Sequence, residues 1–232
     1  MYQYFLKRVF DVLSSGLALI FLSPILLYTA YLVKKRLGSP VLFTQVRPGK
    51  DNKLFKMYKF RSMTDERDED GNLLPDDVRL TSFGKRLRES SLDELPELIN
   101  IFKGDMSVVG PRPQLVRDMV FFSDAEMQRQ SVLPGLTGLA QINGRNNISW
   151  EDKFKYDLQY IKNISFFEDM RIIYRTVFKV ANQDDINTDG METAEDYGDY
   201  LLRTDKIKHC AYVEKQSIAH KLLEDYCEIS RR

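Results

Sequence analysis

The sequence predicts an α+β fold in three parts: an interrupted amino-terminal helix, a compact domain of helices with a small β-hairpin, and a carboxyl-terminal amphipathic helical tail. Three observations predict these parts. An uncharged apolar run covers residues 12–33, a strand–turn–strand pattern covers residues 41–60, and apolar residues recur at helical spacing over residues 204–229. The corresponding boundaries lie at residues 1–36, 37–185 and 186–232.

The composition limits the classes of function. Of the 232 residues, 43% are hydrophobic and 29% are charged, which is typical of a chain that folds and buries a core. The 34 basic and 34 acidic side chains cancel, so no global charge favours nucleic acid as a partner. The two cysteines, Cys210 and Cys227, fit no metal-binding spacing and favour a reducing compartment. Both histidines lie in the tail, so carboxylates are the better candidates for catalysis.

The apolar run from Val12 to Val33 is long enough for a bilayer, because an unbroken helix of this length rises roughly 33 Å. Ser23-Pro24 interrupts it, and proline kinks a helix by removing a donor and clashing with the preceding turn. Basic residues flank both ends, whereas a spanning helix normally has its basic excess on one side; they are Lys7, Arg8, Lys34, Lys35 and Arg36. The run predicts either a re-entrant helix that enters and leaves one leaflet or a kinked single-pass anchor.

Two strands and an acidic loop follow. Residues 41–45 and 54–60 have strand composition on either side of a turn at Arg47-Pro48-Gly49, which predicts a β-hairpin. The acidic residues 64–78 predict an exposed loop, with a metal site as the weaker alternative.

The rest of the domain mixes helices with a long irregular stretch. Helical patterns cover residues 83–90, the segment after Ser91, and residues 150–180. Residues 103–147 are rich in glycine and proline but contain apolar residues as well, so we expect a packed loop of functional importance. Trp150 and the aromatic residues that follow it favour core packing, with stacking on a nucleobase as the alternative.

An adjacent pair of carboxylates, Asp93 and Glu94, is the first candidate for chemistry. Ser91-Leu92-Asp93-Glu94 has the form of a capping box, with Ser91 as N-cap and Glu94 three residues later, and taken alone it favours capping over catalysis. The N-terminus of a helix also binds phosphate and keeps a nearby carboxylate ionised. An ionised aspartate can attack phosphorus, and a second carboxylate can hold Mg²⁺.

Several basic residues on constrained backbone are candidates for phosphate binding. Arg112 lies between Pro111 and Pro113, and proline on both sides restricts the backbone as a preorganised anion site requires. Ordinary surface charge is the alternative for each of them. The others are Lys59 and Arg61 at the end of the second strand, Arg86 and Arg88 before the carboxylate pair, and Arg145 after Gly144.

Three motifs resemble the bacterial sugar transferases. They are KFRSM at residues 59–63, SLDELPELINIFKGDMSVVGPRP at residues 91–113, and PGLTGLAQINGRN at residues 134–146. The chain is similar in particular to the small, PglC-like members of the monotopic phosphoglycosyl transferases. The resemblance runs from about residue 4 to residue 180 and includes Ser23-Pro24, so it favours the re-entrant helix over the single-pass anchor. It implies a place on the cytoplasmic face of the bacterial inner membrane.

The resemblance also implies an activity. In this family Asp93 would attack a UDP-sugar and release UMP, and polyprenyl (undecaprenyl) phosphate would then take the phosphosugar in a ping-pong reaction that begins glycoconjugate assembly. Glu94 would bind Mg²⁺. Leu133 departs from the basic residue expected at its position, which puts one charge contact in doubt. The resemblance assigns substrate contacts to Lys59, Arg88, Arg112 and Arg145, and, as weaker matches, to Arg61, Gln141 and Asn146.

Other functions fit the residues less well. A membrane-attached glycosidase needs two carboxyl groups facing each other about 5–9.5 Å apart across a sugar, and neighbours on one helical turn are poorly placed for that. A phosphatase and a non-enzymatic membrane scaffold are the further alternatives. For the tail we expect packing on the domain, homo-oligomer formation, or contact with downstream glycosyltransferases.

Overall fold

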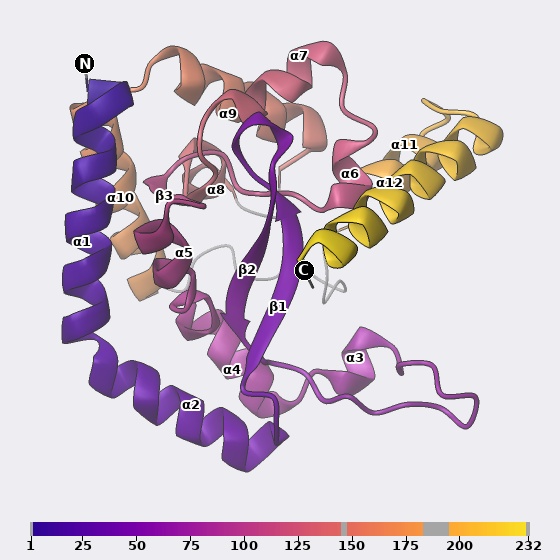
Figure 1. The fold of residues 1–232 in the computed structure, drawn as a ribbon, viewed down its shortest axis with the longest axis horizontal. Helices are drawn as coiled ribbons and strands as arrows, with labels where there is room; N and C mark the ends of the chain where they lie inside the picture. The colour runs from indigo at the N-terminus through magenta and orange to yellow at the C-terminus, as the bar shows by residue number, and fades with distance from the viewer. Residues whose placement is uncertain (1, 145–147, 183–194, 231–232) are drawn as a thin grey trace.

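A computed structural model describes residues 2–144, 148–182 and 195–230. It is mostly helical with two small two-stranded sheets, which confirms the α+β class (Figure 1). The elements are a π-helical turn Tyr2–Leu6, α1 Lys7–Phe21, α2 Ser23–Leu37, β1 Leu42–Pro48, β2 Leu54–Phe60, α3 Asp76–Arg79, α4 Ser82–Glu89, a 3₁₀ turn Leu92–Glu94, α5 Glu97–Lys103, β3 Ser107–Val109, α6 Val116–Met119, α7 Asp124–Met127, a 3₁₀ turn Gln128–Ser131, β4 Gly135–Thr137, α8 Leu139–Ile142, α9 Trp150–Lys162, α10 Phe166–Asn182, α11 Tyr197–Arg203 and α12 His209–Ile229.

The amino-terminal helix is broken where the sequence predicts. The segments Tyr2–Phe21 and Ser23–Leu37 meet at 63°. Pro24 lies in the first turn of α2, where its missing N–H costs little, and Ser23 Oγ donates to the carbonyl of Ile20 at 2.7 Å. In the part of the chain that the structure describes, no single helix is both long and apolar enough to cross a membrane, whereas this bent pair satisfies both criteria together.

The first helix of the bent pair, α1, is fixed to the domain by polar contacts. Lys7 forms an ion pair with Asp169 of α10, and Arg8 donates to the carbonyls of Ile101 and Phe102 at the end of α5. Asp11 accepts from the backbone N–H of Val108 at 2.9 Å. Both cations therefore have partners within the protein, and Lys7 is buried; their place at a membrane boundary stays a prediction.

The predicted hairpin is confirmed, with β1 and β2 antiparallel from Leu42 opposite Phe60 to Pro48 opposite Leu54. The turn lies later than predicted. β1 continues through Pro48, and the chain reverses at residues 49–53, where Asp51 and Asn52 have positive φ. Phe55 and Met57 of β2 pack on α5, so the hairpin and α5 share one hydrophobic cluster.

A second sheet lies within the stretch that was expected to be irregular. β3 and β4 pair in parallel, with Ser107 opposite Gly135 and Val109 opposite Thr137. The backbones approach closely here, because a β-carbon at Gly135 would lie 2.1 Å from the N atom of Gly110. Glycine at position 135 is therefore required by space.

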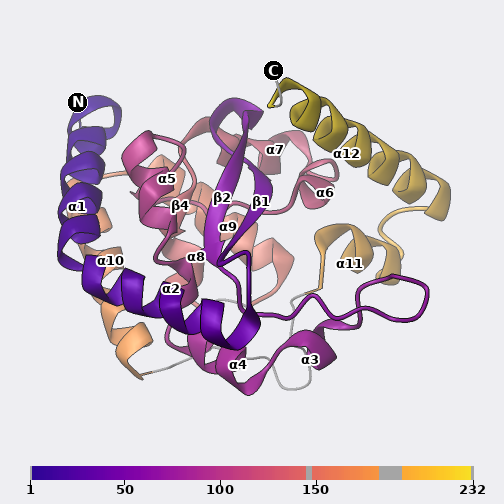
Figure 2. The ribbon, with the colours of Figure 1, turned by 60° about the horizontal axis from the view of Figure 1, so that its bottom comes forward.

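The tail packs on the side of the hairpin away from α1 (Figures 1 and 2). A helix is confirmed in this part of the tail as α12, although it begins at His209 instead of residue 204. Its amphipathic character is confirmed only in part, because Ala219 is buried whereas Ile218 and Ile229 are 48% and 74% exposed. Tyr197 and Ala219 are buried in a cluster with Phe122, Trp150 and Phe154. The core role is thus confirmed for Trp150 and Phe154 over base stacking. Of the roles expected for the tail, packing is the one observed, and oligomer or partner contact stays a prediction.

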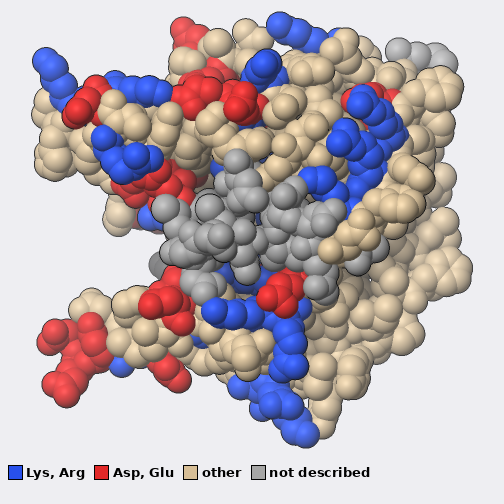
Figure 3. Space-filling view, turned by 180° about the vertical axis from the view of Figure 1, so that it is seen from behind, with Lys and Arg blue, Asp and Glu red and all other residues tan. Residues whose placement is uncertain are grey.

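Charge is distributed unevenly over the surface. The acidic loop 64–78 projects from the body, as predicted, and an area without charged side chains runs along the edge formed by α1 and α10 (Figure 3). On that edge α1 exposes Leu13, Leu17 and Phe21, and α10 exposes Tyr174 and Phe178. Exposed apolar residues that gather along one edge differ from the single surface hydrophobic residues that are normal in any protein.

Candidate active site

Three segments far apart in the sequence meet around Glu94. Lys59, near the end of β2, places its Nζ atom 2.8 Å from Glu94 Oε1. Arg112, in the loop after β3, donates from Nη2 to the same oxygen. Asp93 precedes Glu94 in the 3₁₀ turn and is 8% exposed. The structure therefore brings together four of the residues that the sequence selected.

The predicted capping box is wrong. Ser91 has φ 54° and makes no side-chain cap, whereas an N-cap residue needs extended backbone. The reason is the preceding helix: α4 ends at Glu89 with Ser90 as its C-cap, and Ser91 takes the left-handed conformation that commonly follows a helix. α5 begins only at Glu97. A helix dipole is consequently a poor source of positive charge at this site, and the basic side chains supply that charge instead.

The two adjacent carboxyl groups have opposite electrostatic environments. Burial alone would raise the pKa of Glu94, but Arg112 and Lys59 together hold that pKa well below its usual range. Burial, followed by the charge of Glu94, raises the pKa of Asp93 to about 6. Lys59, Arg88 and Arg112 oppose this rise. At pH 7 Glu94 is therefore fully ionised and Asp93 is mostly ionised but poorly solvated, which suits a nucleophile.

Sequence reasoning missed Glu97. Its carboxyl group is 1% exposed, and its Oε1 atom lies 3.3 Å from Lys59 Nζ, so Lys59 serves both glutamates. Burial raises the pKa of Glu97 to about 7. The sequence carried a signal for it: in the helix predicted after Ser91, residues three and four apart share one face, and Glu97 follows Glu94 and Asp93 by those intervals.

The other predicted contacts have different surroundings. Arg88 Nε donates to Ser62 Oγ at 3.0 Å, and its charge acts on Asp93. Arg61 is turned away from the carboxylate pair, because its guanidinium pairs with Asp65 and donates to the carbonyls of Leu37 and Ser39. Gln141 donates to the carbonyl of Leu136 at 3.1 Å. Arg145 and Asn146 lie outside the residues that the structure describes.

The donor set at the site is compatible with Mg²⁺. Carboxylate oxygens are the ligands that this ion prefers, and it usually takes one or two of them, with waters and substrate phosphate completing its shell. Among the described residues there is no group of three or more His, Cys, Asp or Glu that would hold a metal unaided. Glu94, ionised and only partly buried, is the better placed of the pair for this role.

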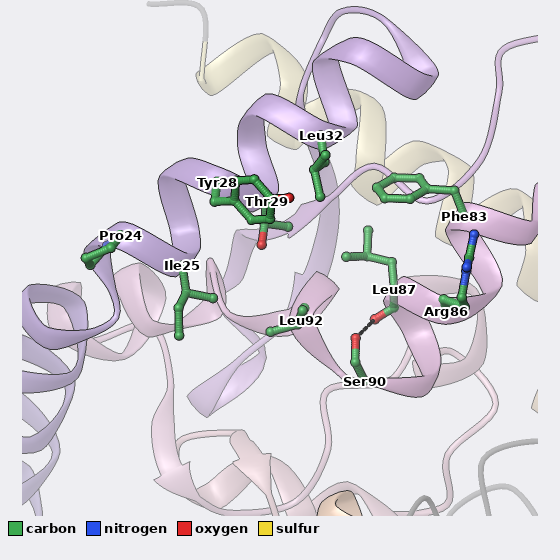
Figure 4. A pocket seen from close by; sticks show the side chains of 10 residues that line it. All are labelled: Pro24, Ile25, Tyr28, Thr29, Leu32, Phe83, Arg86, Leu87, Ser90 and Leu92. Atoms are coloured by element: carbon green, nitrogen blue, oxygen red, sulfur yellow. Dashed lines mark hydrogen bonds between the residues drawn. The ribbon is translucent and has the colours of Figure 1, made fainter.

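An apolar groove of about 470 Å³ lies beside this site, between α2 and α4 (Figure 4). Leu87 and Leu92 point towards α2, where Ile25 and Leu32 face them, and Arg86 lies at the α4 side. Leu92 immediately precedes Asp93 in the chain. The groove therefore lies between the broken helix and the segment that leads into the carboxylate pair.

Comparison with known proteins identifies the family. A family model described as bacterial sugar transferase matches residues 2–183. The chain belongs to the bacterial sugar transferase family. This sugar transferase is 51% identical over 190 residues to the uncharacterized sugar transferase EpsL of Bacillus subtilis (strain 168), and the match covers 82% of this chain and 94% of EpsL.

Two further relatives have more specific names. A UDP-glucose:undecaprenyl-phosphate glucose-1-phosphate transferase of Klebsiella pneumoniae is 45% identical over 183 residues, covering 75% of this sugar transferase but 39% of the Klebsiella protein. The exopolysaccharide production protein ExoY of Rhizobium meliloti (strain 1021) is 39% identical over 188 residues, covering 74% of this chain and 83% of ExoY. The family match ends at residue 183, so α11 and α12 of this sugar transferase lie beyond it.

Proposed function

We propose that this sugar transferase moves a sugar phosphate from a UDP-sugar to polyprenyl phosphate, with a covalent phosphosugar on Asp93 as intermediate, and so begins the assembly of a glycoconjugate. The observation that carries the proposal is a buried aspartate beside a glutamate whose carboxylate is held by Lys59 and Arg112. The name of the Klebsiella relative, which includes both a UDP-sugar and undecaprenyl phosphate, supports the choice of substrates.

The reaction balances without an added acid or base. An oxygen of Asp93 forms a bond to the sugar-bearing phosphorus, and the bond from that phosphorus to the oxygen of UMP breaks. A phosphate oxygen of the acceptor then attacks the same phosphorus and displaces the Asp93 carboxylate. The products are UMP and polyprenyl-diphospho-sugar, and the attacking and leaving oxygens all carry negative charge.

The charges around Asp93 explain a need for a further cation. Lys59, Arg88 and Arg112 face Asp93, Glu94 and Glu97, so the basic and acidic side chains nearly cancel before substrate arrives. A diphosphate adds negative charge to this balance. Mg²⁺ held by Glu94 would neutralise charge on the departing UMP. Lys59 and Arg112 orient Glu94 and offer their remaining N–H groups to phosphate oxygens.

We assign the groove between α2 and α4 to the first isoprene units of the acceptor. Its lining is mostly apolar and includes Leu92, which precedes Asp93 in the chain, and Arg86 adds a positive charge for a lipid phosphate (Figure 4). A membrane lipid can reach this groove if α1 and α2 lie in one leaflet of the inner membrane on its cytoplasmic side. The bend of 63° and the basic residues at the end of α2 support that placement.

Filling the groove is expected to impair use of the acceptor alone. Ile25→Trp should raise KM for polyprenyl phosphate at least fivefold, because the ring occupies space that an isoprene unit needs, whereas UMP release in a single turnover without acceptor should be unchanged. Leu27→Trp is the matched control, since Leu27 is 72% exposed and lies outside the groove lining. Equal KM values in both variants would place the acceptor chain elsewhere.

The proposed activity is tested with purified protein in detergent, a panel of UDP-sugars and polyprenyl phosphate. For the correct sugar we expect UMP as the nucleotide product, with many turnovers when the acceptor is present and at most one without it. A glycosidase would instead release free sugar and UDP. If no UDP-sugar in the panel yields UMP, the proposed function is wrong.

A further inference from the structure

A buried ion pair lies behind the Arg112 loop and outside the carboxylate site. Arg129, in the 3₁₀ turn before β4, pairs with Asp157 of α9 through Nε at 3.1 Å and Nη2 at 2.7 Å. Their side chains are 2% and 3% exposed. The Arg129 guanidinium also lies over the rings of Phe122 and Phe154, at 5.4 and 5.9 Å from their centroids.

Stability alone is a poor explanation for this pair. Removing two charges from water is costly, and hydrophobic residues of similar volume often replace a buried ion pair with no loss of stability. The surroundings are apolar and aromatic, and Tyr197 of α11 packs on both Phe122 and Phe154. Such a site would accommodate apolar side chains well, so the charges call for another role.

The third contact of Arg129 indicates that role. Nη2 donates to the backbone carbonyl of Arg112 at 2.6 Å. The side chain of Arg112 in turn reaches Glu94. Arg129 therefore holds the backbone of Arg112, and Arg112 in turn holds the carboxylate of Glu94.

The sequence of the loop makes this hydrogen bond important. Pro111 and Pro113 have no N–H group, so the segment has few donors and must be held largely through its carbonyls. Each of the three carbonyls in 111–113 has a donor: the N–H of Gly135 for Pro111 at 2.9 Å, Arg129 for Arg112, and Arg47 Nη1 for Pro113 at 3.3 Å. The donor for the central residue, Arg112, is therefore Arg129 of the buried ion pair.

We propose that Arg129 is a positioning residue: oriented by Asp157, it fixes the backbone of Arg112 and so keeps the Arg112 guanidinium on Glu94. This inference rests on the proposed function, in which Arg112 binds Glu94 and phosphate. It gives the ion pair a part in the reaction although neither residue touches substrate. Arg129 limits the movement of a loop whose side chain must be in place when phosphate binds.

The test is a double-mutant cycle between the ion pair and Arg112, with initial rates of UMP release as the readout. The ion pair is replaced by Arg129→Met together with Asp157→Leu, which leaves no buried charge unpaired. We expect a thermal midpoint within about 5 °C of the wild type, a kcat reduced about tenfold and a weaker affinity for UMP by calorimetry. In an Arg112→Lys background the same replacement should change kcat less than twofold.

A matched control uses an arginine of the tail. Arg203→Met removes a guanidinium that pairs with Glu195 and is 63% exposed, and it should leave kcat and the UMP affinity unchanged. Arg129→Lys keeps a positive charge beside Asp157. It should fold as the wild type does but have a lower kcat, because an ammonium lacks the planar fork that reaches Asp157 and the carbonyl together.

Additive effects in the cycle would overturn this role of Arg129, as would a loss of kcat that merely follows a lower thermal midpoint. A wild-type chain that releases no UMP would give a different result, since it would overturn the proposed function and with it the basis for the cycle. The two failures are therefore distinguishable.

Discussion

Asp93→Asn is expected to reduce UMP release by at least about a thousandfold. The amide has nearly the shape of the carboxylate but cannot attack phosphorus, so binding of the UDP-sugar should persist while chemistry stops. The measurement is the initial rate of UMP release with the acceptor present. Asp124→Asn, at an exposed position of α7, is the control and should retain full activity.

The stability of the same variant separates catalysis from folding. The pKa of Asp93 is raised from 3.8 to about 6, so the folded state disfavours its charged form. That penalty is absent below pH 3.8, grows as the pH rises to about 6, and is fully present above it. Asp93→Asn should therefore have a higher thermal midpoint than the wild type at pH 7. Full turnover by this variant would show that Asp93 is not the nucleophile.

Glu94→Gln is expected to lower kcat by about a hundredfold or more and to change the response to Mg²⁺. Lys59 and Arg112 lose their shared anionic partner, and the proposed metal ligand loses its charge. In the wild type, EDTA should abolish turnover and Mg²⁺ should restore it. The variant should need at least tenfold more Mg²⁺. An identical Mg²⁺ dependence in both proteins would exclude Glu94 as the ligand.

The stability effect of this substitution has the opposite sign to that at Asp93. The folded-state pKa of Glu94 lies below its ordinary value of 4.5, so the charge stabilises the fold above pH 4.5 and that contribution is lost as the pH falls. Glu94→Gln should accordingly lower the thermal midpoint at pH 7. Opposite effects on stability would match two different roles. Asp93 would be poorly solvated and ready to attack phosphorus, whereas Glu94 would be held by Lys59 and Arg112.

Local patterns predicted much of the fold. The alternation and turn residues predicted the hairpin, and Ser23-Pro24 predicted the break between α1 and α2. The motifs also selected Lys59, Asp93, Glu94 and Arg112 before their contacts were known, because residue type and constrained backbone are visible in a sequence. These features depend on neighbouring residues, which a single sequence contains.

The remaining features depend on tertiary contacts. Ser91 has the composition of an N-cap, but the end of α4 sets its backbone. β3 and β4 are three residues each, too short for a period to be recognised. The ion pair of Lys7 joins it to Asp169, 162 residues away, and no local pattern predicts that contact. Arg129 acts through a backbone carbonyl, for which a sequence carries no signal.

The central claim is that Asp93 carries the phosphosugar, and mass spectrometry of the protein after incubation with the UDP-sugar alone tests it most directly. We expect that the proteolytic peptide containing Asp93 gains the mass of one sugar phosphate less one water, that UMP appears in equal amount, and that adding polyprenyl phosphate removes the adduct. An adduct on another residue would contradict the account, as would turnover in which UMP forms only when donor and acceptor are bound together and the peptide never changes mass.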